Sequence, residues 1–193
     1  MQKAALYITA LVLPFLLFLG ISWLLPGVLV VTESQFTRAP PDLVFELLDS
    51  HEGMEQWAHW AEEERPGLSA GPGSGPSEGV GCTWVWEMDG QPWGSMSIEE
   101  LEEGQRIVYA VAYSESEIQR ILEIEPDGLA TRITWTERAL LSSSMQRWLG
   151  LIAHESVRSE LSKALRTLDA AAADLQAARM TPKDPAGDDD SSP

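Results

Sequence analysis

The sequence predicts an α+β fold in which a curved antiparallel β-sheet wraps around one long C-terminal helix, preceded by one transmembrane helix. Three observations predict it. Residues 4–31 contain no charged residue, residues 80–138 consist of short segments with apolar and polar alternation, and residues 142–175 repeat apolar residues every three or four positions. A single sheet and a single apolar-faced helix have to cover each other, so the sheet is expected to curl around the helix.

The uncharged run at the N-terminus predicts a membrane anchor. A spanning helix needs about 20 apolar residues, whereas the apolar core of a cleavable signal has about 7–15, so we expect residues 4–31 to be retained in a lipid bilayer rather than cleaved. Lys3 is the charge that precedes the run. The positive-inside rule then predicts a single-pass protein whose soluble domain lies on the periplasmic or extracytoplasmic side.

The next segments predict a strand and two short helices. Residues 28–37 alternate like a strand, and Pro41 suits a helix start. Trp57 and Trp60 lie three residues apart in a second short helix, and residues 65–79, rich in Gly, Pro and Ser, are expected to form a loop. Further strands are expected over residues 79–88, 92–101, 106–113, 117–126 and 129–138.

Glycines and turn residues explain how these strands connect and curve. Asp89-Gly90 is a strong hairpin signal, and Gly79, Gly81 and Gly94 are expected where the sheet bends. The acidic tail is too polar to fold. We therefore expect three parts: residues 1–31 as the anchor, residues 32–176 as the folded domain, and residues 177–193 as a disordered acidic tail.

Composition narrows the classes of partner. The chain has 13 Lys and Arg against 30 Asp and Glu, a net charge of −17, which repels the phosphates of nucleic acids and also favours solubility. The single cysteine, Cys82, excludes an internal disulfide. The three histidines, His51, His59 and His154, show no metal-ligand spacing, and there is no phosphate-binding or dinucleotide motif. We expect neither a metal nor a cofactor.

Large aromatic residues on the inner face of the sheet predict an apolar ligand pocket. A helix and a strongly curved sheet do not close completely, and rings can line the gap; the alternative is that they fill a solid core. Glu137 falls on the face of Trp135, and His154 lies near the apolar stripe of the long helix. Each has a simpler alternative, a solvated strand end or an ordinary helix histidine. The candidate ligand-binding residues are Trp84, Trp86, Tyr109, Tyr113, Trp135, Glu137 and His154.

Several segments carry a family resemblance. They are APPDLVFELLDS (39–50), WAHW (57–60), SEGVGCTWVWE (77–87), GSMSIEELEEGQRIVYAV (94–111) and EPDGLATRITWTE (125–137). With a closing helix after them, they resemble the START-like helix-grip superfamily (SRPBCC), specifically its polyketide cyclase/dehydrase-like branch with an N-terminal membrane helix. The resemblance implies a helix-grip fold with a deep hydrophobic cavity between sheet and long helix. It also implies lipid, sterol or polyketide ligands, which some members cyclise.

Taken together, these features predict a membrane-anchored binding module for a hydrophobic small molecule or lipid. The first alternative is a polyketide cyclase/aromatase-like enzyme that uses Glu137, His154 or a tyrosine hydroxyl. The second is an interaction protein with a closed cavity. No catalytic residue is assigned, because the sequence does not bring two titratable groups together.

Overall fold

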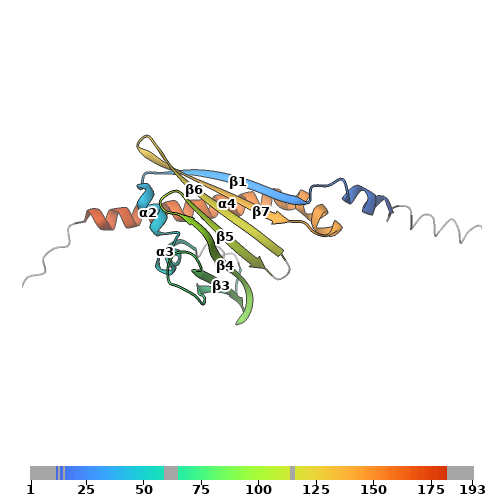
Figure 1. The fold of residues 1–193 in the computed structure, drawn as a ribbon, viewed down its shortest axis with the longest axis horizontal. Helices are drawn as coiled ribbons and strands as arrows, with labels where there is room; N and C mark the ends of the chain where they lie inside the picture. Colours follow the sequence, from blue (N-terminus) through green and yellow to red (C-terminus); the bar gives the residue numbers. More distant parts are fainter. Residues whose placement is uncertain (1–11, 13, 15, 59–64, 114–115, 182–193) are drawn as a thin grey trace, which may run out of the picture.

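One seven-stranded antiparallel sheet and one long helix make up most of the fold (Figure 1). The computed structural model describes residues 12, 14, 16–58, 65–113 and 116–181. Neighbouring strands follow the order β1-β7-β6-β5-β4-β3-β2. The elements are β1 (Val28–Thr37), α2 (Pro41–Glu46), α3 (His51–Trp57), β2 (Leu68–Pro72), β3 (Thr83–Met88), β4 (Gln91–Glu102), β5 (Arg106–Tyr113), β6 (Ser116–Asp127), β7 (Ala130–Leu140) and α4 (Ser144–Met180).

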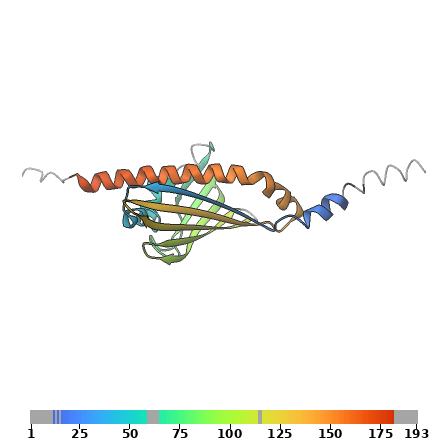
Figure 2. The ribbon, with the colours of Figure 1, turned by 90° about the horizontal axis from the view of Figure 1, so that it is seen from above.

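The α+β arrangement predicted from the sequence is confirmed. Seen at a right angle to the first view, α4 lies along one side of the curved sheet, next to β1 (Figure 2). The pairing of β1 with β7 sets the inner face, because Val31 lies opposite Glu137 and Glu33 opposite Trp135. Strand β5, the middle strand of the sheet, is apolar and buried on both faces, with Ile107 and Val108 fully buried.

The sheet bends where its strands carry bulges. The register shifts between Trp86 and Glu87 and again between Ile98 and Glu100, which increases the local twist. Gly94 lies opposite Trp86, and a Cβ atom there would come within 2.5 Å of the Tyr113 ring. The other two glycines expected at bends, Gly79 and Gly81, lie instead in the turn before β3 with φ values of 73° and 91°.

The segment expected to be a loop over residues 65–79 contains an edge strand. β2 pairs with β3 alone, so Ala70 lies opposite Trp86 and Pro72 opposite Trp84. A proline is tolerated at a sheet edge because its missing N–H faces no partner strand. The glycines and prolines of this segment therefore predicted a loop, whereas its pairing with β3 makes residues 68–72 a strand.

The two short helices pack tightly against each other. The Ser50 hydroxyl accepts the Gly53 N–H at 3.1 Å and so caps α3. Gly53 lies against the end of α2, where a Cβ atom would be 2.4 Å from the Glu46 carbonyl oxygen. The Trp57 indole N–H donates to the Leu47 carbonyl at 2.7 Å, which fixes α3 on α2. His59 and Trp60 lie outside the described residues.

Helix α4 begins with a capping box and ends at Met180. The Ser143 hydroxyl accepts the Gln146 N–H, and the Gln146 side chain accepts the Ser143 N–H. Its buried side chains follow the predicted helical spacing and include Leu161, Leu165 and Leu168. Residues 177–180 of the expected tail form the last turn of α4, and residues 182–193 lie outside the described part of the chain.

The apolar N-terminal run is divided between different structures. Residues 16–22 are helical, a turn and the Pro26-Gly27 pair follow, and β1 begins at Val28, where pairing with β7 satisfies its backbone. Residues 1–11, 13 and 15 lie outside the described part. Within the residues that are described, no helix is long and apolar enough to cross a membrane. This finding corrects the expected transmembrane helix over residues 4–31, its contact with a lipid bilayer and the single-pass localisation with an extracytoplasmic domain.

The helical residues before β1 pack on the start of α4 instead. The Phe18 and Trp148 rings stack with centroids 5.5 Å apart and planes 12° from parallel. The buried Ser22 hydroxyl donates to Ser144 Oγ at 2.9 Å, and the guanidinium of Arg147 donates to the Ser22 carbonyl at 3.3 Å. These contacts explain why the helix ends at this position and turns into β1.

Candidate functional site

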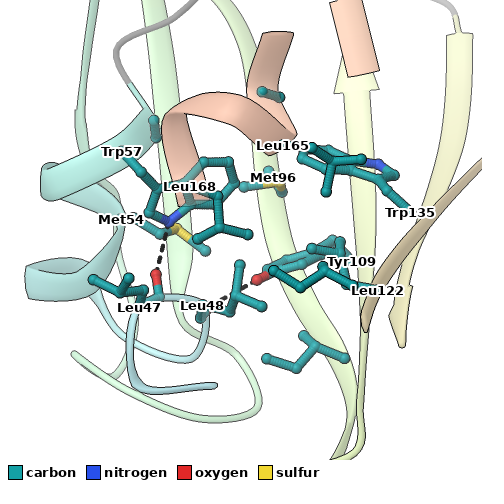
Figure 3. Packing of buried hydrophobic residues seen from close by; sticks show 14 of the residues in the cluster. Leu47, Leu48, Met54, Trp57, Met96, Tyr109, Leu122, Trp135, Leu165 and Leu168 are labelled. Atoms are coloured by element: carbon teal, nitrogen blue, oxygen red, sulfur yellow. Dashed lines mark hydrogen bonds between the residues drawn. The ribbon is translucent and has the colours of Figure 1, made fainter. Parts of the chain in front are cut away.

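The space between α4 and the middle strands is filled by large side chains. Leu165 and Leu168 project from α4 toward Met96, Tyr109 and Trp135 on the sheet (Figure 3). The backbone of α4 approaches β1 most closely, so these rings occupy the interval between the helix and the centre of the sheet. Among the candidate pocket residues, Trp84, Tyr109 and Trp135 are at most 1% exposed, and Trp86 is 3% exposed.

A buried ion pair interrupts this apolar interior. Arg120 on β6 and Glu137 on β7 occupy directly opposed positions on the inner face. The Arg120 Nε–H donates to Glu137 Oε2 at 2.9 Å, and both side chains are buried, 5% and 11% exposed. The same guanidinium donates to the Tyr113 hydroxyl at 3.4 Å and to the Met96 sulfur at 3.9 Å. We call Arg120, Glu137, Tyr113, Met96 and Trp135 the Arg120 cluster.

Aromatic faces surround the guanidinium. Its central carbon lies 5.6 Å from the centroid of the Trp135 ring and 5.9 Å from that of Tyr113. Burial alone would lower the pKa of Arg120, but Tyr113 and Glu137 outweigh it, and the net direction of the pKa is upward. Arg120 therefore stays charged, and Glu137 is its counter-ion.

A chain of ring and charge contacts links the cluster to α4. Tyr113 packs against Trp86 and Trp93, with ring centroids 5.5 and 4.8 Å away. The guanidinium of Arg65 lies over the Trp93 ring at 5.1 Å and forms an ion pair with Glu160 of α4 at 3.0 Å. The contacts thus run from the buried pair across β5 and β4 to the helix. They position Tyr113 between the interior and the partly exposed end of the sheet.

Two indole groups in the interior have unused hydrogen-bond capacity. Trp84 Nε1 and Trp135 Nε1 are buried and find no acceptor. A buried N–H without a partner costs about 1–3 kcal/mol. Arg120 adds to this set, because an arginine has five N–H donors and the three hydrogen bonds named above use one donor each. The interior is therefore rich in donors and has one carboxylate as its main acceptor.

The structure brings most candidate residues together but separates others. Trp86, Tyr113, Trp135 and Glu137 meet around Arg120. Tyr109 has a structural role, since its hydroxyl donates to the Leu48 carbonyl at 2.6 Å. Burial, and next the charge of Asp49, raises the pKa of Tyr109 well above its ordinary value, so its proton is held tightly.

The two described histidines lie outside the Arg120 cluster. A ring nitrogen of His51 is 2.8 Å from the Thr83 carbonyl oxygen, and its ring centroid lies 6.4 Å from that of Trp84. His154 lines a hollow of the surface between the start of β1 and the first turns of α4. Among the described residues, no group of three or more His, Cys, Asp or Glu side chains could hold a metal ion.

Arg120, the central residue of the cluster, was not among the residues predicted from the sequence. The signal was present, because Arg120 stands at an inner position between Ile118 and Leu122 in the period-two pattern of β6. A charged residue at an apolar position calls for a buried counter-ion. Only the β6–β7 register identifies Glu137 as that counter-ion.

Three hollows of the surface lie away from the Arg120 cluster. One of about 650 Å³ lies on the outer face of the sheet and is lined by Ser97, Ala110 and Arg138, among others. A second, of about 780 Å³, is acidic and is lined by Asp42, Glu46, Asp49, Glu52, Glu78 and Glu103 together with apolar and small residues. The third, of about 400 Å³, is the one that His154 lines.

Solved structures confirm the helix-grip architecture of this chain. A protein of Thermus thermophilus has 16% sequence identity and a TM-score of 0.57, and the match covers 76% of this chain and 98% of that one. A protein of Arthrobacter aurescens has 16% identity and a TM-score of 0.56, covering 76% and 87%. A Rhizobium leguminosarum protein has 17% identity and a TM-score of 0.55, covering 76% and 95%. At such identities the likeness concerns the fold.

Sequence comparison identifies the family of the chain. No curated protein matches it in sequence. A family model described as polyketide cyclase / dehydrase and lipid transport matches residues 29–173, which is more than half of the chain and runs from β1 into α4. The chain therefore belongs to the polyketide cyclase / dehydrase and lipid transport family, within the START-like superfamily.

Proposed function

We propose that the protein binds a hydrophobic small molecule or lipid between the sheet and α4, and that the Arg120 cluster receives an oxygen atom of that ligand. The family description supports an apolar ligand. The observation that carries the proposal is the buried Arg120–Glu137 pair beside indole N–H groups that lack acceptors. Ligand sites are mostly apolar with a few polar groups that fix orientation, and this interior has that composition.

The chemistry of the cluster indicates which end of the ligand it would contact. Arg120, Tyr113 and the Trp135 indole offer N–H and O–H donors, whereas Glu137 is occupied by Arg120. A carbonyl, carboxylate or phenol oxygen would accept these donors. The rest of the ligand would lie among Trp86, Met96 and the aliphatic side chains of α4.

Binding is favoured over a cyclase-type reaction by the state of the candidate acid–base groups. Glu137 accepts a hydrogen bond at 2.9 Å from the Arg120 guanidinium, which stays charged, and is engaged as its counter-ion. The Tyr109 hydroxyl is engaged with the Leu48 carbonyl, and His154 lies in another hollow. Glu137 and Tyr109 are therefore engaged and His154 lies away from the Arg120 cluster, so none of the three is placed to act as the proton donor or base of such a reaction.

Because the interior is packed, a ligand has to displace side chains or α4 to enter. Association should therefore be slower than the usual range of about 10⁵–10⁷ M⁻¹s⁻¹. Native mass spectrometry of the purified full-length chain is the first test, because a slowly exchanging ligand should co-purify. A mass that always equals that of the bare chain, together with no binding of apolar probes, would make the interior a solid core and favour the interaction-protein alternative.

The polar contact has its own test. We expect 2-naphthol to bind more tightly than naphthalene by about 2- to 12-fold, the worth of one hydrogen bond. In the double variant Arg120→Met/Glu137→Leu, which removes both charges together, this preference should fall, because only the Tyr113 and Trp135 donors remain, while naphthalene still binds. Phe36→Ala is the matched control, since that ring is 55% exposed on the outer face of β1. An equal preference in wild type and double variant would contradict the role of Arg120.

A further inference from the structure

The hollow beside the start of β1 is a candidate second binding site. It has a volume of about 400 Å³, inside the range of about 300–1,000 Å³ that small-molecule sites occupy. It shares no lining residue with the Arg120 cluster. Its lining is apolar apart from two side chains of α4, Arg147 and His154, and includes Leu29, Leu141 and Leu151.

Arg147 brings an uncompensated positive charge to this hollow. Its Nε–H donates to the Leu141 carbonyl and its Nη1–H to the Ser22 carbonyl, both at 3.3 Å. Both acceptors are neutral, and within the described residues Arg147 forms no ion pair. The Arg147 Nη2 donates no hydrogen bond to a described residue. It lies beside Gly27, where a Cβ atom would be 3.6 Å from Nη2, so the glycine leaves space next to this nitrogen.

His154 supplies a second polar group two helical turns further along α4. It is half-buried, lines the hollow and forms no hydrogen bond or ion pair in the described part of the chain. Residues 147 and 154 are seven apart and therefore lie on one side of the helix. The hollow thus has an aliphatic wall from β1 and a row of two nitrogen-bearing side chains from α4.

The charge distribution favours an anion at this end of the molecule. Residues 16–32 and 138–154 hold no Asp or Glu but include Arg138 and Arg147, whereas all 30 acidic residues of the sequence fall elsewhere. The nearest acidic residues in sequence are already paired. Glu33 and Glu155 contact Arg158 at 2.8 and 3.8 Å, and Glu137 contacts Arg120 at 2.9 Å. The negative charge of the rest of the protein repels an anion, but these three carboxylates near the hollow in sequence are each paired with an arginine.

We propose that this hollow binds an amphipathic monoanion, an alkyl chain ending in a carboxylate, with the carboxylate on Arg147 and the chain along β1, Leu151 and His154. A carboxylate would accept from the Arg147 Nη2–H, which forms a charge-assisted hydrogen bond, while His154, about 10 Å further along α4, would lie beside the alkyl chain. The alkyl chain would cover Leu29, Leu141 and Leu151. The site is separate from the interior proposed above and does not depend on it.

The test is calorimetric titration of the full-length protein with decanoate below its micelle concentration. We expect saturable binding of decanoate and none, or binding at least tenfold weaker, of decanol and decyltrimethylammonium. Octanoate should bind more weakly, since each buried CH₂ contributes up to about fourfold in affinity. Equal binding of all three ten-carbon compounds would overturn the proposal, because the charge would then have no role.

Variants locate the site. Arg147→Gln should weaken decanoate binding at least tenfold, and Leu151→Trp, at a position 53% exposed, should fill the hollow and abolish binding without unfolding the domain. Arg138→Gln is the matched control, because it removes the same charge from the same acid-free region but lines the outer hollow of the sheet. We expect its affinity to stay within twofold of wild type.

Two measurements separate this site from the interior. The His154 ring resonances should shift on decanoate binding, which reports on the hollow even if Arg147→Gln fails to fold. The Arg120→Met/Glu137→Leu variant should bind decanoate as wild type does. Unshifted His154 resonances, or binding lost in the Arg120 variant and kept in Leu151→Trp, would assign the ligand to the interior and overturn the second site.

Discussion

Arg120 and Glu137 lie directly opposite each other on neighbouring strands and form an ion pair of 2.9 Å inside an aromatic core. Desolvating two charges costs several kcal/mol, and close pairing with additional hydrogen bonds offsets that cost. Tyr113 and the ring faces of Trp135 supply the additional contacts. The pair is therefore held in one geometry, which is the property a ligand-orienting group needs.

Breaking this pair should be much more harmful than removing it. Glu137→Leu should lower the free energy of unfolding by about 3–5 kcal/mol, because it leaves a buried guanidinium without a counter-ion. Arg120→Met/Glu137→Leu should be closer to wild type than Glu137→Leu. Urea unfolding measures both, with Arg179→Ala as the control, since its pair with Glu46 is half-exposed and worth at most about 1 kcal/mol. Arg120→Met is the second single variant. If the double variant lost as much unfolding free energy as the two single variants together, the coupling would be contradicted.

Gly53 should not tolerate a methyl group although it lies in a helix. Alanine normally stabilises a helix interior relative to glycine by about 0.5–1 kcal/mol. Here the Cβ atom would meet backbone, 2.4 Å from the Glu46 oxygen and 2.6 Å from the Leu47 Cα, so Gly53→Ala should destabilise the fold by about 1–3 kcal/mol. Gly71→Ala in β2 is the control, since nothing lies within 4 Å of its Cβ position. Thermal melts of equal midpoint for the two variants would show that α2 and α3 can move apart.

Asp49 should make the protein less stable as the pH rises. Burial, followed by the charge of Glu78, raises the pKa of Asp49 in the folded state above its ordinary value. The folded state then holds the proton at pH values where the unfolded chain has lost it, so stability falls as the pH rises from the unfolded pKa, about 3.9, through the folded one. Asp49→Asn should therefore be more stable than wild type at pH 7, and the difference should vanish below the unfolded pKa.

Urea unfolding between pH 3 and pH 8 measures this difference for Asp49→Asn. Asp174→Asn, at an exposed position on α4, removes the same charge and is the matched control. A stabilisation of the two variants that is equal at every pH would attribute the effect to net charge rather than to the environment of Asp49.

Trp84 should behave as a packed core residue. Its side chain is fully buried, so Trp84→Ala should cost about 3–5 kcal/mol of unfolding free energy. Trp84→Phe should lose less, in part because the indole N–H has no acceptor and no hydrogen bond is removed. Trp23→Ala, at a position 84% exposed, should stay within about 0.5 kcal/mol of wild type. Chemical unfolding compares them, and a small cost for Trp84→Ala would mean that its ring already borders empty space.

The sequence by itself determined the elements whose signal is local. The alternation along β7 and the helical spacing of Leu161, Leu165 and Leu168 predict those elements without knowledge of their partners. Alternation also places Trp135 and Glu137 on one face, which is correct. Such patterns depend on residues a few positions apart, so a single chain segment contains them.

Only the tertiary structure decided what depends on distant contacts. β2 exists because β3 offers a partner edge, and Arg120 meets Glu137 because of the β6–β7 register. His154 has the spacing of the apolar stripe but faces the start of β1, since the first turns of α4 extend past the core. Register and docking are set by the packing of segments far apart in the sequence, such as Arg179 against Glu46, which are 133 residues apart, so no pattern within one segment predicts them.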